Sequence, residues 1–150
     1  MLAVAVGRFQ VFQLTAGHKS LLDLAASMSS SLLVLLGCEV LESFETTSKR
    51  NPLTLHQRVP LIREHNPNAI IKPIYDMESD LDWCQQLDDL VLETMKKTND
   101  RDAIMVGGRE SFLSIYTGIF RKREISTCIS ESGTEQRERL MSIAMVTDNA

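Results

Sequence analysis

Short apolar runs alternate with helical patterns along this chain, and that alternation constrains the fold more than any other feature. The apolar runs are mostly continuous, as in strands buried on both faces, and lie at residues 2–6, 32–36, 69–75, 103–106 and 125–129. Helical spacing occupies the stretches that follow them, at residues 18–28, 54–65, 80–97, 110–119 and 134–146. Asp80 is the expected N-cap of the third helix, and one face of that helix carries Leu87, Leu90, Val91 and Met95.

The repeated strand-helix order predicts right-handed crossovers and therefore an α/β fold. We expect a Rossmann-like, doubly wound sheet of about five parallel strands with helices on both faces. Ligands of such sheets bind beyond the carboxyl ends of the strands. The loops that follow the strands are therefore the segments in which a functional site is expected.

Length and charge limit the classes of protein to consider. The 150 residues, 43% of them hydrophobic, predict one domain over residues 1–150, because a chain of this length can bury about 68–70% of its unfolded surface. Sixteen basic and twenty acidic residues give a net charge of −4. This balance lacks the basic surplus that non-specific binding to nucleic acid requires, so we expect no nucleic-acid partner.

The cysteines and the lengths of the apolar runs indicate the cellular location that we expect for the protein. Cys38, Cys84 and Cys128 are odd in number and contain no CxxC pair, so we expect neither a disulfide framework nor a zinc site. The longest strictly apolar run is residues 1–6, far short of the roughly 20 residues of a membrane-spanning helix. We therefore expect no membrane span and no signal peptide, and a cytoplasmic location.

The loop after the first strand is the most informative segment. It begins at Gly7 and ends at Gly17, directly before His18, and it matches neither the GxGxxG nor the GxxxxGK[ST] fingerprint. It still has the physics of a phosphate site, because glycines admit a close ligand, a helix N-terminus supplies free N–H groups, and Arg8 and Lys19 add positive charge. The alternative is a tight strand-to-helix turn in which His18 is simply solvated.

Motifs in four segments of this chain resemble those of one enzyme family. Thr15-Ala16-Gly17-His18 resembles the [HT]xGH signature of the nucleotidyltransferase superfamily. Gly7-Arg8-Phe9-Gln10 resembles the opening of nicotinamide-nucleotide (NMN) adenylyltransferases, particularly the archaeal type and the adenylyltransferase domain of bifunctional Nudix enzymes. Residues 49–54, with Arg58 after them, are similar to the family's Asn-Pro-Phe-[Ser/Thr] stretch. Residues 105–110, followed by Tyr116 and Phe120, are similar to its Val-Gly-x-x-Lys-Asp stretch. Residues 132–137 are similar to its Ser-x-Thr-x-x-Arg stretch.

Two departures from the family pattern affect the expected substrate. Two extra residues separate the GRFQ element from His18, so either Gln13 or Thr15 takes the place of the family's first His. A Thr at that place resembles pantetheine-phosphate adenylyltransferases, whereas the GRFQ and Asn-Pro elements do not. Arg109-Glu110 stands where Lys-Asp is usual, which keeps both charges but changes the donor geometry.

The resemblance implies attack by a substrate phosphate on the α-phosphorus of ATP, with release of pyrophosphate. It implies that His18 bonds the α-phosphate, that Thr15 reaches the β- or γ-phosphate, and that Arg137 clamps the leaving pyrophosphate. The other nucleotide-binding residues that it implies are Gly7, Arg8, Phe9, Gln10, Gly17, Lys19, Gly107, Gly108, Arg109, Ser132 and Thr134. The substrate-binding residues that it implies are Arg50, Asn51, Arg58, Asp80 and Trp83.

The partners follow from the same resemblance. They are ATP and NMN, or a similar phosphorylated small molecule, with Mg²⁺ held by ATP oxygens and water rather than by a cluster of protein ligands. A homo-oligomer and a further C-terminal module in a longer parent chain both stay open.

Several alternatives also remain open from the sequence. Arg50, Arg58 and Arg109 could each be a solvated surface charge, and Trp83 could be a core anchor as readily as a stacking surface for nicotinamide. The acceptor could be another phosphorylated molecule, such as pantetheine phosphate. A non-catalytic nucleotide-sensing domain with the same fold is the alternative from a different class.

Overall fold

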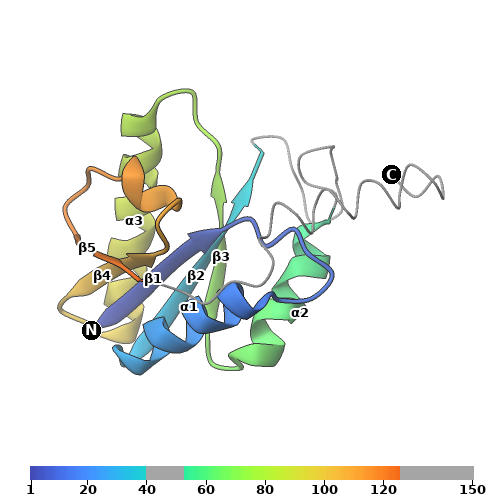
Figure 1. Ribbon diagram of the computed structural model, residues 1–150. Helices are drawn as coiled ribbons and strands as arrows, with labels where there is room; N and C mark the ends of the chain where they lie inside the picture. The colour runs from blue at the N-terminus through green and yellow to red at the C-terminus, as the bar shows by residue number, and fades with distance from the viewer. Residues whose placement is uncertain (40–52, 126–150) are drawn as a thin grey trace.

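A computed structural model describes residues 1–39 and 53–125 of the chain (Figure 1). Its centre is a five-stranded sheet, all parallel, with the strand order β3-β2-β1-β4-β5. The strands are β1 (Leu2–Gly7), β2 (Ser31–Cys38), β3 (Ile70–Tyr75), β4 (Ala103–Gly107) and β5 (Arg121–Glu124). The helices are α1 (Ala16–Ser27), α2 (Leu55–His65) and α3 (Asp80–Thr98), with one 3-10 turn, η1 (Phe112–Ser114). The predicted doubly wound α/β fold is confirmed.

Side-chain alternation along β1 divides the core into two layers. Ala3 and Ala5 pack in the cluster that includes residues of α1 and α2, whereas Leu2 and Val4 pack in the cluster that includes residues of α3. All four side chains are fully buried, because β1 is the central strand and helices cover both of its faces (Figure 1). The carboxyl end of β1 is therefore the fixed point from which the first loop departs.

Each helix begins at a hydroxyl side chain that caps it. Thr15, Thr54 and Ser79 precede α1, α2 and α3, and each accepts a hydrogen bond from the backbone N–H three residues further on. Ser79, not the predicted Asp80, is the N-cap of α3; Asp80 is its first helical residue, where a carboxylate is favourable to the helix dipole. The apolar face predicted for α3 is confirmed, since Leu87 and Val91 are fully buried.

The structure corrects the prediction for the segment after β4. Residues 110–119 were expected to be a helix, but only η1 forms there. The chain turns instead, because the buried carboxylate of Asp88 accepts hydrogen bonds from the Tyr116 hydroxyl at 2.6 Å and from the Ile119 N–H at 3.2 Å. A long-range partner thus replaces the bonds that would have continued a helix.

The fifth strand also differs from its prediction. The strand was expected over 125–129, whereas β5 covers Arg121–Glu124 and all four of its side chains are exposed. An edge strand needs only one paired side, and β5 obtains it from β4. Residues 126–129 and the helix predicted over 134–146 lie outside the described residues.

Candidate active site

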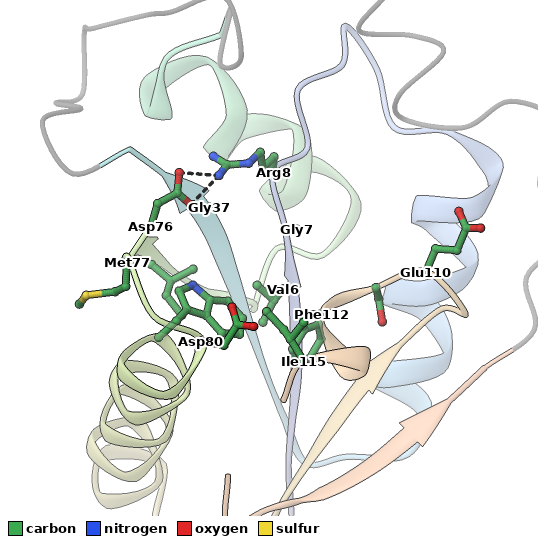
Figure 2. Close-up of a pocket in the computed structure, with 13 residues that line it drawn as sticks. Val6, Gly7, Arg8, Gly37, Asp76, Met77, Asp80, Glu110, Phe112 and Ile115 are labelled. Atoms are coloured by element: carbon green, nitrogen blue, oxygen red, sulfur yellow. Dashed lines mark hydrogen bonds and ion pairs between the residues drawn. The ribbon is translucent and has the colours of Figure 1, made fainter. Parts of the chain in front are cut away.

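A pocket of about 540 Å³ opens at the carboxyl end of the sheet (Figure 2). This is where the strand order reverses, since β1 is followed by β2 on one side and has β4 on the other. The ends of three strands, the start of α3 and the loop after β4 supply its lining: Val6, Gly7, Arg8, Gly37, Ile74, Asp76, Met77, Asp80, Trp83, Glu110, Ser111, Phe112 and Ile115. Gly7, Arg8, Asp80 and Trp83 among them were predicted site residues.

Aromatic rings and carboxylates both line this pocket. Trp83 and Phe112 meet edge to face, with ring centroids 6.2 Å apart and an interplanar angle of 62°. Asp80, in the first turn of α3, and Glu110, in the loop after β4, are both exposed lining residues, and Figure 2 shows them on different sides of the pocket. Trp83 packs against Phe112 and also lines the pocket, which is compatible with either of its predicted roles. Aromatic rings and a carboxylate in one lining suit a flat ring that carries positive charge.

Arg8 crosses the mouth of the pocket to Asp76. Its Nη2 atom lies 2.5 Å from Oδ1 and 2.7 Å from Oδ2 of Asp76, which follows β3 (Figure 2). Sequence reasoning placed Asp76, with Asp80, as a carboxylate near Trp83 that would favour a cationic ring, but it did not predict the pairing of Asp76 with Arg8, and it missed Glu110 and Phe112 as lining residues. The signal that could have found the pairing is that Arg8 and Asp76 each follow a parallel strand directly, at the end of the sheet where sites occur.

The start of α1 orients His18. The His18 N–H donates to Thr15 Oγ1 at 3.0 Å, and the Thr15 N–H donates to Nδ1 of His18 at 3.2 Å. This is a capping box with a histidine at its third position. Because Nδ1 accepts a hydrogen bond, the neutral ring carries its proton on Nε2, which is then the donor atom of the side chain.

Phe9 connects His18 with the pocket. Its ring centroid lies 5.0 Å from that of His18, and a Cβ atom added to Gly7 would come within 3.0 Å of Cε2 of Phe9. Gly7 thus leaves room for this ring. Phe9 is 4% exposed and has a φ of 51°, in the left-handed region that few residues other than glycine adopt. A strain of about 1–3 kcal/mol is held here by the packing around the ring.

Two predicted ligand-binding residues direct their polar atoms to the backbone. Gln10, 1% exposed, bonds both main-chain polar atoms of Leu53 through its side-chain amide. Arg58 is fully buried, and its Nη1 atom donates to the carbonyls of Arg8 at 3.0 Å and Gly37 at 2.8 Å. Neither side chain belongs to the pocket lining. In the contacts described here, both side chains stabilise the backbone segments that form the site.

The glycines after β4 differ from each other. A Cβ atom on Gly107 would collide with Oγ of Ser111, whereas one on Gly108 would meet no atom within 4 Å. Gly107 is therefore required by packing, while Gly108 borders open space that a ligand can approach. Arg109 and Lys19 are exposed, and Gly17 is buried in the first turn of α1.

Five of the predicted site residues belong to segments that the structure does not describe. Arg50, Asn51, Ser132, Thr134 and Arg137 lie outside the described residues.

The described part of the chain contains no group of three or more His, Cys, Asp or Glu side chains that could hold a metal ion. Within the same ranges, every helix is too short or too polar to cross a lipid bilayer.

Burial controls the chemistry of Tyr116, which packs behind Phe112. Loss of solvation raises the pKa of Tyr116 well above its usual range, and the hydrogen bond to the Asp88 carboxylate raises it further. Its hydroxyl therefore stays protonated, and it supports the loop after β4 rather than acting as a base. The backbone N–H of Phe120 donates to the same oxygen at 2.9 Å.

Comparisons with known proteins concern the fold. Neither a protein-family model nor a curated protein sequence matches the chain. A bifunctional NMN adenylyltransferase/ADP ribose pyrophosphatase from Francisella tularensis, solved with AMP and a manganese ion, has a similar structure, with a TM-score of 0.73 and 21% sequence identity over 94% of this chain. The NadR protein, solved with NAD and AMP-PNP, matches 99% of this chain with a TM-score of 0.56 and 14% identity. This chain spans 41% of each of those longer chains. The described residues therefore have the Rossmann-like α/β fold of these two nucleotide-bound proteins, as the resemblance to nucleotidyltransferases predicted.

Proposed function

We propose that residues 1–150 are an adenylyltransferase domain that transfers the adenylyl group of ATP to nicotinamide mononucleotide, giving NAD and pyrophosphate. The observation that carries the proposal is His18, which stands at the start of α1 with Nδ1 fixed by the backbone of Thr15. A donor nitrogen is thereby oriented at a helix N-terminus, where phosphate charge is favourable. The sequence motifs and the similarity of fold support the same proposal.

In this reaction the protein contributes mainly by positioning the two substrates and by stabilising the charge that develops. A phosphate oxygen of NMN forms a bond to the α-phosphorus of ATP, and the bond from that phosphorus to the pyrophosphate oxygen breaks, so the electron pair leaves with pyrophosphate. Nε2 of His18 donates to an α-phosphate oxygen as negative charge develops there. Arg137, with Ser132 and Thr134, takes the role of holding the leaving group.

The pocket supports NMN as the acceptor. The nicotinamide ring of NMN is cationic, and the face of Trp83 attracts such a ring, with carboxylates of Asp80 and Glu110 in the same lining. The resemblance implies that Arg8 binds the nucleotide, but Arg8 lines the same pocket as Trp83, so in this proposal it donates to the phosphate group of NMN. Arg50 and Asn51 complete the acceptor site in this proposal, and Gly108 and Arg109 border the nucleotide.

Magnesium enters with ATP in this proposal. As the resemblance implies, the ion is held by triphosphate oxygens and water, and no step is assigned to a protein-bound ion.

The geometry of Thr15 bears on the pantetheine alternative. A threonine at this position resembled pantetheine-phosphate enzymes, but the Thr15 hydroxyl caps α1 and accepts the N–H of His18. Helix capping accounts for Thr at this place without reference to the acceptor. Thr15 is therefore not an argument for pantetheine phosphate, and the GRFQ and Asn-Pro elements remain the support for NMN.

One assay tests the proposal. The protein is incubated with ATP, Mg²⁺ and NMN, and NAD and pyrophosphate are measured in parallel with a reaction that contains 4′-phosphopantetheine in place of NMN. Equal amounts of NAD and pyrophosphate are expected with NMN, and no pyrophosphate with the pantetheine compound. The reverse pattern would make pantetheine phosphate the acceptor, and ATP binding without product in either reaction would indicate a nucleotide sensor.

A further inference from the structure

We infer that Asp76 is a positioning residue, which holds the Arg8 side chain across Gly37 along the rim of the pocket. The inference rests on the proposed function for the identity of the phosphate that Arg8 binds. The structural part of the inference, that Arg8 is held in a fixed position on the rim, depends only on contacts within the described residues.

The pair spans a strand. Arg8 follows β1 and Asp76 follows β3, and β2 lies between these two strands. The Arg8 side chain must therefore pass over the end of β2 before its Nη2 atom reaches the two carboxylate oxygens of Asp76, at 2.5 and 2.7 Å. Figure 2 shows this crossing above Gly37. Only 14% of the Arg8 side chain is exposed.

Gly37 makes the crossing possible. A Cβ atom added there would lie 3.1 Å from Cγ of Arg8 and 3.6 Å from both Cζ and Nη1. The first of these distances is shorter than ordinary van der Waals contact, so a larger residue at position 37 would displace the aliphatic part of Arg8. The arginine thus lies directly on the backbone of β2.

The Asp76 end of the pair is held by main-chain bonds. The Asp76 N–H donates to the Cys38 carbonyl at 2.8 Å. The preceding residue, Tyr75, has its N–H and its carbonyl both bonded by the side-chain amide of Gln86, at 2.9 and 2.8 Å. The carboxylate is therefore mounted on backbone that two other elements fix.

The Arg8 end is held in the same way, because the Arg8 carbonyl accepts from Nη1 of Arg58. With both backbones fixed, the ion pair limits the rotamers of a long side chain that loses much freedom when it is ordered. An arginine ordered in advance binds a phosphate with a smaller entropic loss. Asp76 acts through Arg8 in this way.

Two substitutions test the inference from different directions. Asp76→Asn weakens the ion pair with little change of shape, and Gly37→Ala displaces Arg8 without changing either charge. Each should raise KM for NMN about tenfold and change kcat less than about threefold, as expected for a loss of binding that is equal in ground and transition states. Asp89→Asn is the matched control, because Asp89 is an exposed carboxylate of α3 outside this pocket, and its KM should stay at the wild-type value.

A double-variant cycle separates positioning from a general structural effect. In an Arg8→Met background, Asp76→Asn should raise KM no further, because its action requires the arginine. A further rise of similar size would show that Asp76 acts without Arg8 and would overturn the inference. An unchanged or lowered KM in the single Asp76→Asn variant would overturn it as well.

A readout that needs no substrate distinguishes this inference from the proposed function. The Arg8 Nε–Hε signal, identified by its loss in Arg8→Lys, should be visible and slow to exchange in the NMR spectrum of the wild type and broadened by exchange in Asp76→Asn, but not in Asp89→Asn. A signal that Asp76→Asn leaves unchanged contradicts the inference even if NAD is formed. A wild-type protein that forms no NAD contradicts the proposed function alone.

Discussion

The side-chain amide of Gln10 pairs with the main chain of Leu53 much as a neighbouring strand would. Nε2 donates to the Leu53 carbonyl at 2.9 Å, and Oε1 accepts the Leu53 N–H at 2.6 Å. Two segments far apart in sequence, the loop after β1 and the approach to α2, are joined by this one buried side chain. The resemblance implies that Gln10 binds the nucleotide, whereas in these contacts Gln10 joins the GRFQ element to the motif at residues 49–54.

Replacement of Gln10 by Met should therefore destabilise the protein. The change leaves the N–H and the carbonyl of Leu53, which is partly buried, without these bonds, and a fully buried polar group that loses its partner costs about 1–3 kcal/mol. We expect a loss of about 2 kcal/mol in the free energy of unfolding, measured by urea denaturation. Gln13→Met, at an exposed position of the same loop, should change it by less than about 0.5 kcal/mol. Equal effects of the two substitutions would contradict this role of Gln10.

His18→Gln separates the chemistry of His18 from its capping. Glutamine is a usual third residue of a capping box, so the bond to the Thr15 N–H is retained and the melting temperature should change little. Loss of the imidazole donor should lower kcat by about 10²–10³. His18→Ala should lower kcat similarly and also reduce stability. A His18→Gln enzyme with wild-type turnover would remove the ring from the mechanism.

Trp83 should report NMN binding, because it is the single tryptophan of the chain and lines the pocket. We expect NMN to quench its fluorescence saturably. Trp83→Leu, which keeps an apolar side chain against Phe112, should raise KM for NMN about fivefold through the lost cation–π contact, with KM for ATP nearly unchanged. Parallel rises in both constants would indicate a packing role only.

Tyr116→Phe should change how stability depends on pH. The pKa of Tyr116 is raised above its ordinary value of 10.0 in the folded protein. The folded state thus keeps a proton that the unfolded state releases, and the stability from this group is complete below about pH 10 and falls as the pH rises further. Urea midpoints between pH 8 and 11 should fall less steeply in Tyr116→Phe than in the wild type. At pH 8 the variant should be less stable by about 2 kcal/mol, because Asp88 loses a buried charge-assisted bond. Identical pH profiles would contradict this account.

Local pattern was sufficient to predict four of the five strands and the longest helix. The strand at 32–36 is buried on both faces and is therefore continuously apolar, and the third helix buries one face and therefore spaces Leu87 and Val91 four residues apart. Each of these patterns lies within a single segment, so it can be recognised from that segment alone. The turn after η1 depends on Asp88, which precedes it by 28 residues, and no local pattern reveals such a partner. For the same reason the ion pair of Arg8 with Asp76 could not be predicted, since it requires the order of β1, β2 and β3 in the sheet.

The two outer strands of the described sheet affect whether two copies of this chain can associate through their sheet edges. β3 contains Pro73, which has no N–H to offer, and β5 consists of four exposed charged residues, Arg121 to Glu124. Proline and dense charge both make a strand a poor template for another strand. Neither outer strand of the described sheet thus favours edge-to-edge stacking of one molecule on the next, so the described sheet is protected from continuing into a second copy.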